Sequence, residues 1–142
     1  MKKINPFIIS LFLLIGFVGC EKEKEELVPT KLYGAWKLIG FVSTADNTLR
    51  EAEPKDCEEC YTITFLNDGT ITGHTSTNEL WGQYRITGRN LNFIQLGGTE
   101  ISELFDGRNY VEALYKVNRF EIISNQLKLY YGDTDYLLFK RK

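Results

Sequence analysis

The feature that most constrains the fold of this chain is a series of short apolar runs separated by turn-forming residues. Residues 61–65 alternate apolar and polar side chains, which is the period of a half-buried strand. Asn67-Asp68-Gly69 follows, and Asp-Gly supplies the positive φ values that a tight hairpin turn requires. Residues 70–75 are then expected to return as the partner strand. The pattern predicts neighbouring antiparallel strands.

Similar runs recur along the rest of the chain. The expected strands are residues 31–42, 61–65, 70–75, 81–87, 91–96, 120–123, 127–131 and 136–139. The polar stretch 44–60 is expected to be a long loop, and Gly97-Gly98 are expected to end the strand before them. Alternation within 81–87 places Gly82, Tyr84 and Ile86 on one face.

One segment has helical rather than strand periodicity. Tyr110, Leu114 and Val117 are spaced by four and three residues, which predicts a helix over residues 107–117. Asp106 or Asn109 could cap its start. We therefore expect a mainly β protein, a small antiparallel barrel or sandwich of about eight strands with one short helix.

The N-terminus has the pattern of an export signal. Lys2 and Lys3 precede an apolar run over residues 7–18, which at 1.5 Å per residue reaches about 18 Å, well short of the ~30 Å hydrocarbon core of a bilayer. This order of charge, apolar run and small residue is typical of a secretory signal, here residues 1–19.

Cys20 is the candidate lipidation site. Residues 17–20 resemble a lipobox, although Phe17 stands where the usual form has Leu. A lipidated Cys20 would anchor the mature chain firmly, because each buried methylene contributes about 0.8 kcal/mol. Residues 20–30 then form the lipidated Cys and a charged tether, and residues 31–142 the domain. The acidic tether resembles those of surface-exposed Bacteroidetes-type lipoproteins, and a plain spacer is the alternative.

An ordered series of short matches along residues 36–140 resembles the META domain, a family of bacterial heat-shock-inducible lipoproteins associated with novobiocin resistance. The matching pieces are Gly34-Ala35-Trp36-Lys37-Leu38, Thr64-Phe65, Asp68-Gly69, Gly73 with Asn78, Gly82 with Tyr84, Leu114, Arg119-Phe120-Glu121-Ile122, Leu127 with Leu129-Tyr130, and Tyr136-Leu137-Leu138-Phe139-Lys140. The resemblance implies a compact β-rich barrel with one helix and an envelope or surface role without enzymatic activity. A lipocalin-like barrel fits the same strand signals.

The chain also departs from this family. Members often carry Gly-Cys-Asn where this chain has Ser76-Thr77-Asn78, and a second Cys near residues 98–101. Any disulfide that the family builds there is therefore absent. Asn78 matches the family's Asn and is the polar residue we single out, with a structural or a functional role.

Cys57 and Cys60 form a CxxC pair. Zinc requires four ligands, and beyond this pair the chain offers only His74 and carboxylates, so no metal site is expected. A redox dithiol needs a lowered thiol pKa, which the intervening Glu58 and Glu59 oppose. In an oxidising envelope we expect a structural disulfide between Cys57 and Cys60.

The remaining polar residues form no motif for catalysis. His74 has no triad-like partner, and Glu100, Glu103 and Asp106 are typical of an acidic helix start, with a hydrolase pair as the alternative. The formal charge of −2 and the absence of a basic stripe argue against nucleic acid as a partner.

We therefore expect a non-enzymatic, lipid-anchored protein of the cell envelope, at the outer membrane or the cell surface, with a stress-related or protein-interaction role and no cofactor. The alternative is a lipocalin-like binder of a small apolar ligand. In either case the protein would bind the membrane through its lipid. Its second partner would be an envelope protein or the small apolar ligand.

Overall fold

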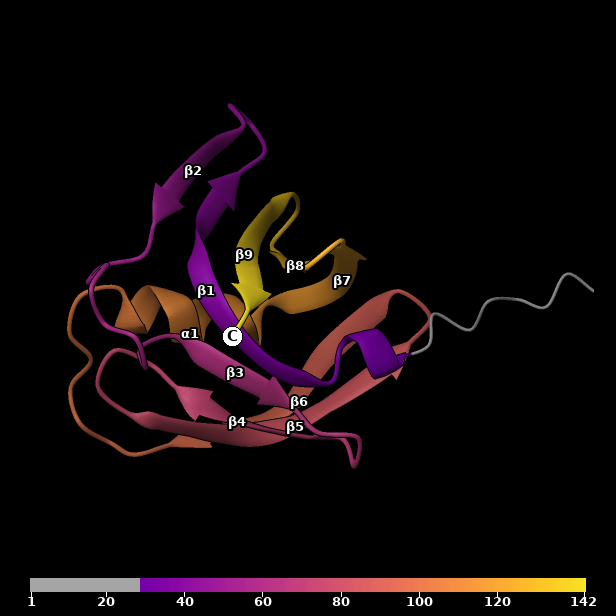
Figure 1. Cartoon of the computed structure of the whole chain (residues 1–142), viewed down its shortest axis with the longest axis horizontal. Coiled ribbons are helices and arrows are strands. Elements are labelled where there is room, and N and C mark those ends of the chain that lie inside the picture. The colour runs from indigo at the N-terminus through magenta and orange to yellow at the C-terminus, as the bar shows by residue number, and fades with distance from the viewer. Residues whose placement is uncertain (1–28) are drawn as a thin grey trace, which may run out of the picture.

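The computed structural model describes residues 29–142 (Figure 1). The expected signal peptide, Cys20 and nearly all of the tether lie outside the described residues. A short 3-10 turn, η1 (Pro29–Lys31), opens the domain. The strands are β1 (Gly34–Ser43), β2 (Thr48–Glu51), β3 (Thr62–Phe65), β4 (Thr70–His74), β5 (Glu79–Thr87), β6 (Asn90–Gly98), β7 (Val117–Ile123), β8 (Gln126–Tyr131) and β9 (Asp135–Arg141), and the helix is α1 (Gly107–Tyr115).

All strands belong to one antiparallel sheet that closes on itself. Its order is β2-β1-β3-β4-β5-β6-β7-β8-β9, and β1 pairs with β9 as well. Neighbouring strands are mostly joined by short turns, as the turn residues indicated. The prediction of a mainly β, antiparallel fold with one short helix is confirmed.

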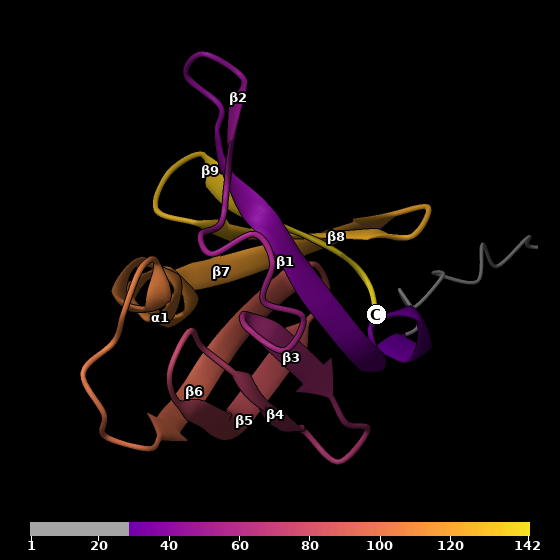
Figure 2. The ribbon, with the colours of Figure 1, turned by 60° about the vertical axis from the view of Figure 1, so that its left-hand side comes forward.

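The ring contains two junctions of very different kinds. At the closed seam, β1 and β9 pair from Trp36 opposite Arg141 to Val42 opposite Tyr136. At the open seam, β6 and β7 pair only where Asn90 lies opposite Arg119. Helix α1 connects β6 to β7 and lies beside this open seam (Figure 2).

Several expected boundaries are wrong. Residues 44–60 are not only loop, because β2 pairs with the second half of β1 in a hairpin. The first strand begins at Gly34 rather than residue 31, and the helix ends at Tyr115 because Val117 already pairs with Tyr131 in β7 and β8. Gly97 and Gly98 do not end β6, since they pair with Trp81 and Leu80 of β5.

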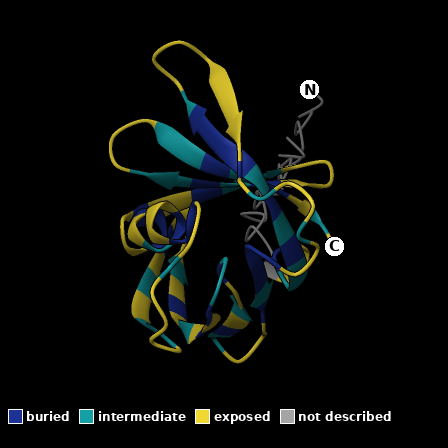
Figure 3. Cartoon of the chain, turned by 90° about the vertical axis from the view of Figure 1, so that its left-hand side faces the viewer, coloured by how far each residue is buried: buried dark blue, intermediate teal, exposed yellow. Residues whose placement is uncertain are grey.

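Large side chains fill the inside of the ring. The bulkiest fully buried residues are Trp36, Tyr61, Tyr110, Phe65 and Phe139. Strand β5 alternates as expected, with Leu80 and Tyr84 buried and Trp81 and Gln83 facing outward. Figure 3 shows that much of β1 is buried, whereas β2, parts of α1 and the loop before α1 are exposed.

Candidate functional site

A cleft of about 400 Å³ lies between β6 and α1 at the open seam. Four of its lining residues, Arg108, Val111, Glu112 and Tyr115, follow helical spacing on one stripe of α1. The opposite wall consists of Leu96, Gly97 and Gly98 at the end of β6 and the start of the loop that follows. The β4–β5 turn closes one side with Thr75 and Asn78.

Asn78 is buried at this turn, with 6% of its surface exposed. Its amide nitrogen donates to the Ile101 carbonyl and to the Glu103 carboxylate, both at 2.7 Å. Its amide oxygen accepts from the Thr99 hydroxyl at 2.8 Å and the Ile101 backbone N–H at 2.9 Å. The side chain therefore uses its full hydrogen-bonding capacity to hold the loop between β6 and α1.

The Glu103 carboxylate completes this arrangement, which we call the Asn78 clamp (Thr75, Ser76, Asn78 and Glu103). It accepts from the hydroxyls of Thr75, at 2.7 Å, and Ser76, at 2.9 Å. Gly107 packs so tightly here that a Cβ atom would lie 2.1 Å from a Glu103 oxygen. Hydrogen bonds thus join the two segments where the family resemblance implies that other members have cysteines.

Asp106 forms a second clamp at the start of α1, the Asp106 clamp (Arg50, Glu53, Tyr61 and Asp106). Its carboxylate pairs with Arg50 at 3.0 Å and accepts the Glu53 backbone N–H at 2.8 Å. Its own N–H donates to the Tyr61 hydroxyl at 3.1 Å, and that hydroxyl donates to the Glu53 carbonyl. Of the two expected capping residues, Asp106 occupies the N-cap position but makes no side-chain capping bond, and Asn109 lies inside the helix.

The pKa of Asp106 reflects these contacts. Burial of the carboxylate acts to raise its pKa. The hydrogen bonds from Arg50, the Glu53 amide and Asn109 outweigh that effect and bring the pKa below its ordinary value. The ionised carboxylate therefore connects β2, the loop after it and α1.

Large apolar side chains are exposed on the segment that the two clamps hold. Ile101, Leu104 and Phe105 precede α1 with 62%, 58% and 69% of their surfaces exposed, and Tyr115 ends α1 at 62%. Phe105 has φ of +50°, which is unfavourable for a bulky residue. Such backbone conformations persist where the surrounding structure imposes them, and the flanking clamps supply that constraint.

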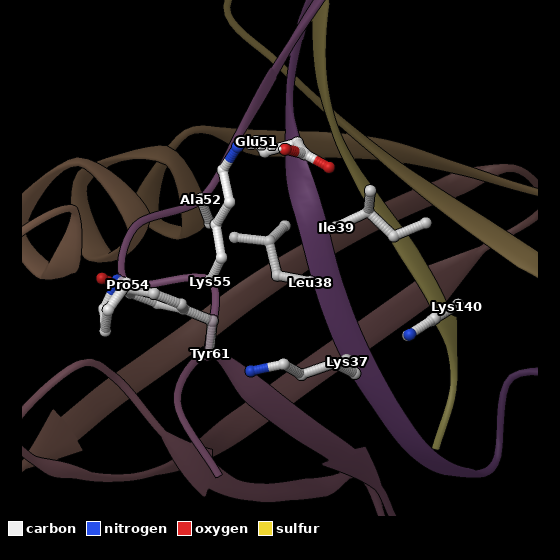
Figure 4. A pocket seen from close by; sticks show the side chains of 9 residues that line it. All are labelled: Lys37, Leu38, Ile39, Glu51, Ala52, Pro54, Lys55, Tyr61 and Lys140. Atoms are coloured by element: carbon white, nitrogen blue, oxygen red, sulfur yellow. Dashed lines mark ion pairs between the residues drawn. The ribbon is translucent and has the colours of Figure 1, made fainter. Parts of the chain in front are cut away.

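A smaller cavity of about 160 Å³ lies across β1 (Figure 4). The Lys37 ammonium points toward the Tyr61 side and donates to the carbonyls of Cys57, at 2.7 Å, and Cys60. Burial, followed by the charge of Lys142, lowers the pKa of Lys37. Lys55 pairs with Glu51 at 2.5 Å. Since these charges are already engaged within the protein, this cavity is the weaker candidate.

Cys57 and Cys60 lie in the loop before β3, with their sulfur atoms bonded and their Cα atoms 5.4 Å apart. Lys37 binds the carbonyls at both ends of this loop. The pair therefore lies beside β1, and the Cys60 sulfur also lies 3.7 Å from the Ser76 carbonyl in the β4–β5 turn.

The other residues noted in the sequence separate in the structure. His74 is exposed on β4. Glu100 and Glu103 both line the cleft, Glu103 as part of the Asn78 clamp, whereas Asp106 belongs to the other clamp. Among the described residues, no group of three His, Cys, Asp or Glu side chains is placed to hold a metal ion. Between residues 29 and 142, no helix has the length and apolar character to cross a membrane.

Two features were not identified from the sequence: the apolar loop, which carries Ile101, Leu104 and Phe105, and the stripe of α1 that lines the cleft. The spacing of Arg108, Val111, Glu112 and Tyr115 was a usable signal, because a second stripe on an amphipathic helix faces something other than the core. Exposed Leu104 and Phe105 between acidic residues were a further signal.

Comparisons with known proteins agree with this fold. A protein of Tannerella forsythia named "Putative lipoprotein" is 29% identical over 141 residues, covering 98% of this chain and 96% of that protein. An NMR structure of a protein from Burkholderia xenovorans has a TM-score of 0.64 and 26% identity, covering 80% of this chain and 86% of its own. The crystal structure of a DUF4847 family protein from Bacteroides vulgatus, with a TM-score of 0.59 and 22% identity, covers 77% and 92%. The META domain model matches residues 30–142. The chain therefore belongs to the META domain family.

Proposed function

We propose that this protein is a lipid-anchored, non-enzymatic component of the cell envelope that binds another protein through the end of the domain formed by α1 and the loop before it. The observation that carries the proposal is the concentration of exposed Ile101, Leu104, Phe105 and Tyr115 on one rigidly held segment. Exposed apolar clusters of this kind mark interaction sites.

The position of this segment supports a protein partner rather than the anchoring membrane. In both ribbon views, η1, where the described chain begins, lies at the opposite end of the domain from α1 and its preceding loop (Figures 1 and 2). An anchor attached through residues 20–28 would therefore leave the apolar loop facing away from the lipid.

Lipid anchoring at Cys20, after cleavage of residues 1–19, is supported by the sequence pattern and by the name of the Tannerella relative. The acidic tether supports display at the outer membrane and the cell surface. A stress-related role rests on the family resemblance alone.

A lipocalin-like role has less support. Such a protein holds its ligand inside the ring of strands, where this domain has Trp36, Phe65, Tyr110 and Phe139. Catalysis also has little support, since Glu103 and Asp106 are engaged in clamps that hold backbone segments rather than converging on a shared point.

Site-specific photo-crosslinking in growing cells tests the interaction. A benzophenone amino acid at Leu104 or Phe105 should capture one and the same protein, and one at exposed Leu66 or Ile123 should not. The purified partner should bind the full-length protein and lose at least about tenfold in affinity on Phe105→Ser. Equal capture from all four positions, or unchanged affinity, would refute the proposal.

Anchoring is tested separately by metabolic labelling. Radiolabelled palmitate should enter the protein, and Cys20→Ser should abolish both the label and fractionation with membranes. A Cys57→Ser variant should keep both properties. Label that persists in Cys20→Ser would contradict the assignment.

A further inference from the structure

Strand β6 leaves one of its two edges almost without a strand partner. Toward β5 it is paired from Leu80 opposite Gly98 to Thr87 opposite Asn90. Toward β7, across the part of the chain that the structure describes, the pairing stops after Asn90 opposite Arg119. The unpaired N–H and C=O groups of an open edge are a template for another extended segment.

Two contacts identify the backbone groups on this open edge. The Tyr115 hydroxyl donates to the Leu96 carbonyl at 3.3 Å, so Leu96 presents its carbonyl toward α1. The Thr99 N–H donates to the Glu79 carbonyl at 3.3 Å, which directs Thr99 toward β5. Because successive residues of a strand present their backbone to opposite edges, Gly98 faces the same side as Leu96.

The space beside this edge is open. Val111 and Tyr115 of α1 face it across the cleft of about 400 Å³. Gly97 and Gly98 allow close approaches within the domain: a Cβ at Gly97 would lie 2.8 Å from the Trp81 indole nitrogen, and one at Gly98 would lie 2.4 Å from the Glu79 carbonyl oxygen. The Tyr115 side chain crosses this cavity, because its hydroxyl bonds to the Leu96 carbonyl on the edge of β6.

The charges around the cleft indicate the chemistry of its occupant. Its lining includes Glu79, Glu100, Glu103 and Glu112, and Arg108 is the only basic residue among its lining residues. Leu96, Ile101 and Val111 contribute apolar surface. An apolar side chain next to a Lys or Arg would complement both features.

We propose that an extended segment of the protein partner adds to the open edge of β6 as a further strand, lying between β6 and α1. Its backbone takes the place of the Tyr115 hydroxyl at the Leu96 carbonyl and also hydrogen-bonds to Gly98. An apolar side chain contacts Val111, and a Lys or Arg side chain meets Glu100 and Glu112. This is β-strand addition, in which backbone bonds provide affinity and alternate side chains provide specificity. The inference rests on the proposed interaction function and specifies its geometry.

A random peptide library tests this geometry without knowledge of the partner. Phage-displayed dodecapeptides are selected on the full-length protein in detergent micelles, and the tightest binder is synthesised. Hydrogen exchange should show slower exchange at the Leu96 and Gly98 amides when this peptide binds. N-methylation along the peptide should weaken binding about tenfold at every second residue and little between, because only alternate N–H groups face β6.

Paired variants locate the binding site. Val111→Trp fills the cleft and should abolish binding, whereas Lys116→Trp places the same residue at the end of α1 outside the lining and should not. Glu112→Lys should weaken a basic peptide about tenfold, and Glu58→Lys, an identical charge change in the loop before β3, should leave binding unchanged.

The outcomes separate the two proposals. A selected peptide whose affinity is insensitive to alternate N-methylation, or equal affinity for Val111→Trp and the wild type, would overturn strand addition. Protection of Leu96 and Gly98 that rises with protein concentration in the absence of peptide would assign the edge to a second copy and also overturn it. If the partner crosslinked at Phe105 still binds the Val111→Trp protein, the interaction function stands and strand addition is wrong.

Discussion

The closed seam and the open seam each join two strands of the same ring, but they do so through different contacts. β1 and β9 are joined by a backbone ladder from Trp36 to Val42. β6 and β7 meet at one strand pair and at one side-chain bond, from the Asn92 amide to the Val117 carbonyl. The Asn78 and Asp106 clamps hold the loop that connects β6 to α1. A ladder uses up the backbone groups that it joins, whereas side-chain clamps leave strand edges and apolar residues exposed for binding.

The largest effect should come from truncation at the closed seam. Phe139 is fully buried on β9, opposite Leu38. Phe139→Ala should lower the free energy of unfolding by about 3–5 kcal/mol, because it removes a large core side chain and leaves a cavity. Urea denaturation followed by tryptophan fluorescence measures this loss. Leu104→Ala, at the exposed loop of the open side, should change it by less than about 0.5 kcal/mol.

Next in size is the Asn78 clamp. Asn78→Ala removes four side-chain hydrogen bonds and leaves the contacts of half-buried Glu103 incomplete, so a loss of about 2–3 kcal/mol is expected. Hydrogen exchange should also accelerate at Ile101 while β1 and β9 amides keep their protection. Asn118→Ala, which removes one exposed bond of 3.3 Å, is the matched control. Equal losses from both variants would show that the clamp does not hold the loop.

The Asp106 clamp should make the open side sensitive to acid. The pKa of Asp106 is lowered in the folded protein, so its stabilisation is complete above the unfolded value near 4 and is lost as pH falls through the folded pKa. Asp106→Asn should cost about 2 kcal/mol at pH 7 and flatten the decline of stability below pH 4. Parallel curves for variant and wild type would contradict this linkage.

The Cys57–Cys60 disulfide, which lies beside β1, should contribute less to the free energy of unfolding than either clamp. Cys57 and Cys60 enclose a very short loop, and a chain-entropy estimate for a loop of this size is about 2 kcal/mol at most. Without reductant, iodoacetamide should leave both cysteines unmodified. A Cys57→Ser, Cys60→Ser double variant should lose about 1–2 kcal/mol and retain peptide binding at the cleft. Full labelling of the untreated protein would refute the disulfide.

The smallest effects should come from two buried tyrosines that lie edge to face, with ring centroids 5.5 Å apart. Tyr61→Phe loses the bonds to Glu53 and Asp106 and should cost about 1 kcal/mol. The Tyr110 hydroxyl is buried with no hydrogen-bond partner among the described residues, so Tyr110→Phe should be neutral or slightly stabilising. The midpoint temperatures of thermal unfolding of the two variants measure this difference. A larger loss for Tyr110→Phe than for Tyr61→Phe would contradict the assignment of Tyr61 to the clamp.

Much of the fold could be predicted because local signals carried it. Asp68-Gly69 and the alternation in β5 act over a few residues, and the structure places both as expected. β2 was missed because its four residues are all exposed, so no apolar period marks them. The sequence predicts a strand end at Gly97 and Gly98, and this is wrong because their strand conformation depends on pairing with β5, a tertiary contact.

The site was harder to predict than the fold. Asn78 was identified, but its partners Ile101 and Glu103 lie more than twenty residues further along the chain and could not be paired with it from spacing. The open edge of β6 depends on where β7 departs from the sheet. A single sequence contains no signal for that departure.

The bond between the two ends of the described chain has a mechanical consequence. Arg141, at the end of β9, donates to the Tyr33 carbonyl at 2.7 Å just before β1 begins, and Trp36 lies opposite Arg141. A pulling force that enters through the N-terminal tether would load the ladders that β1 forms with β9 and with β3, with many bonds in shear at once. These ladders would bear the force before it reached the cleft, so the cleft would keep its shape while the tether is pulled.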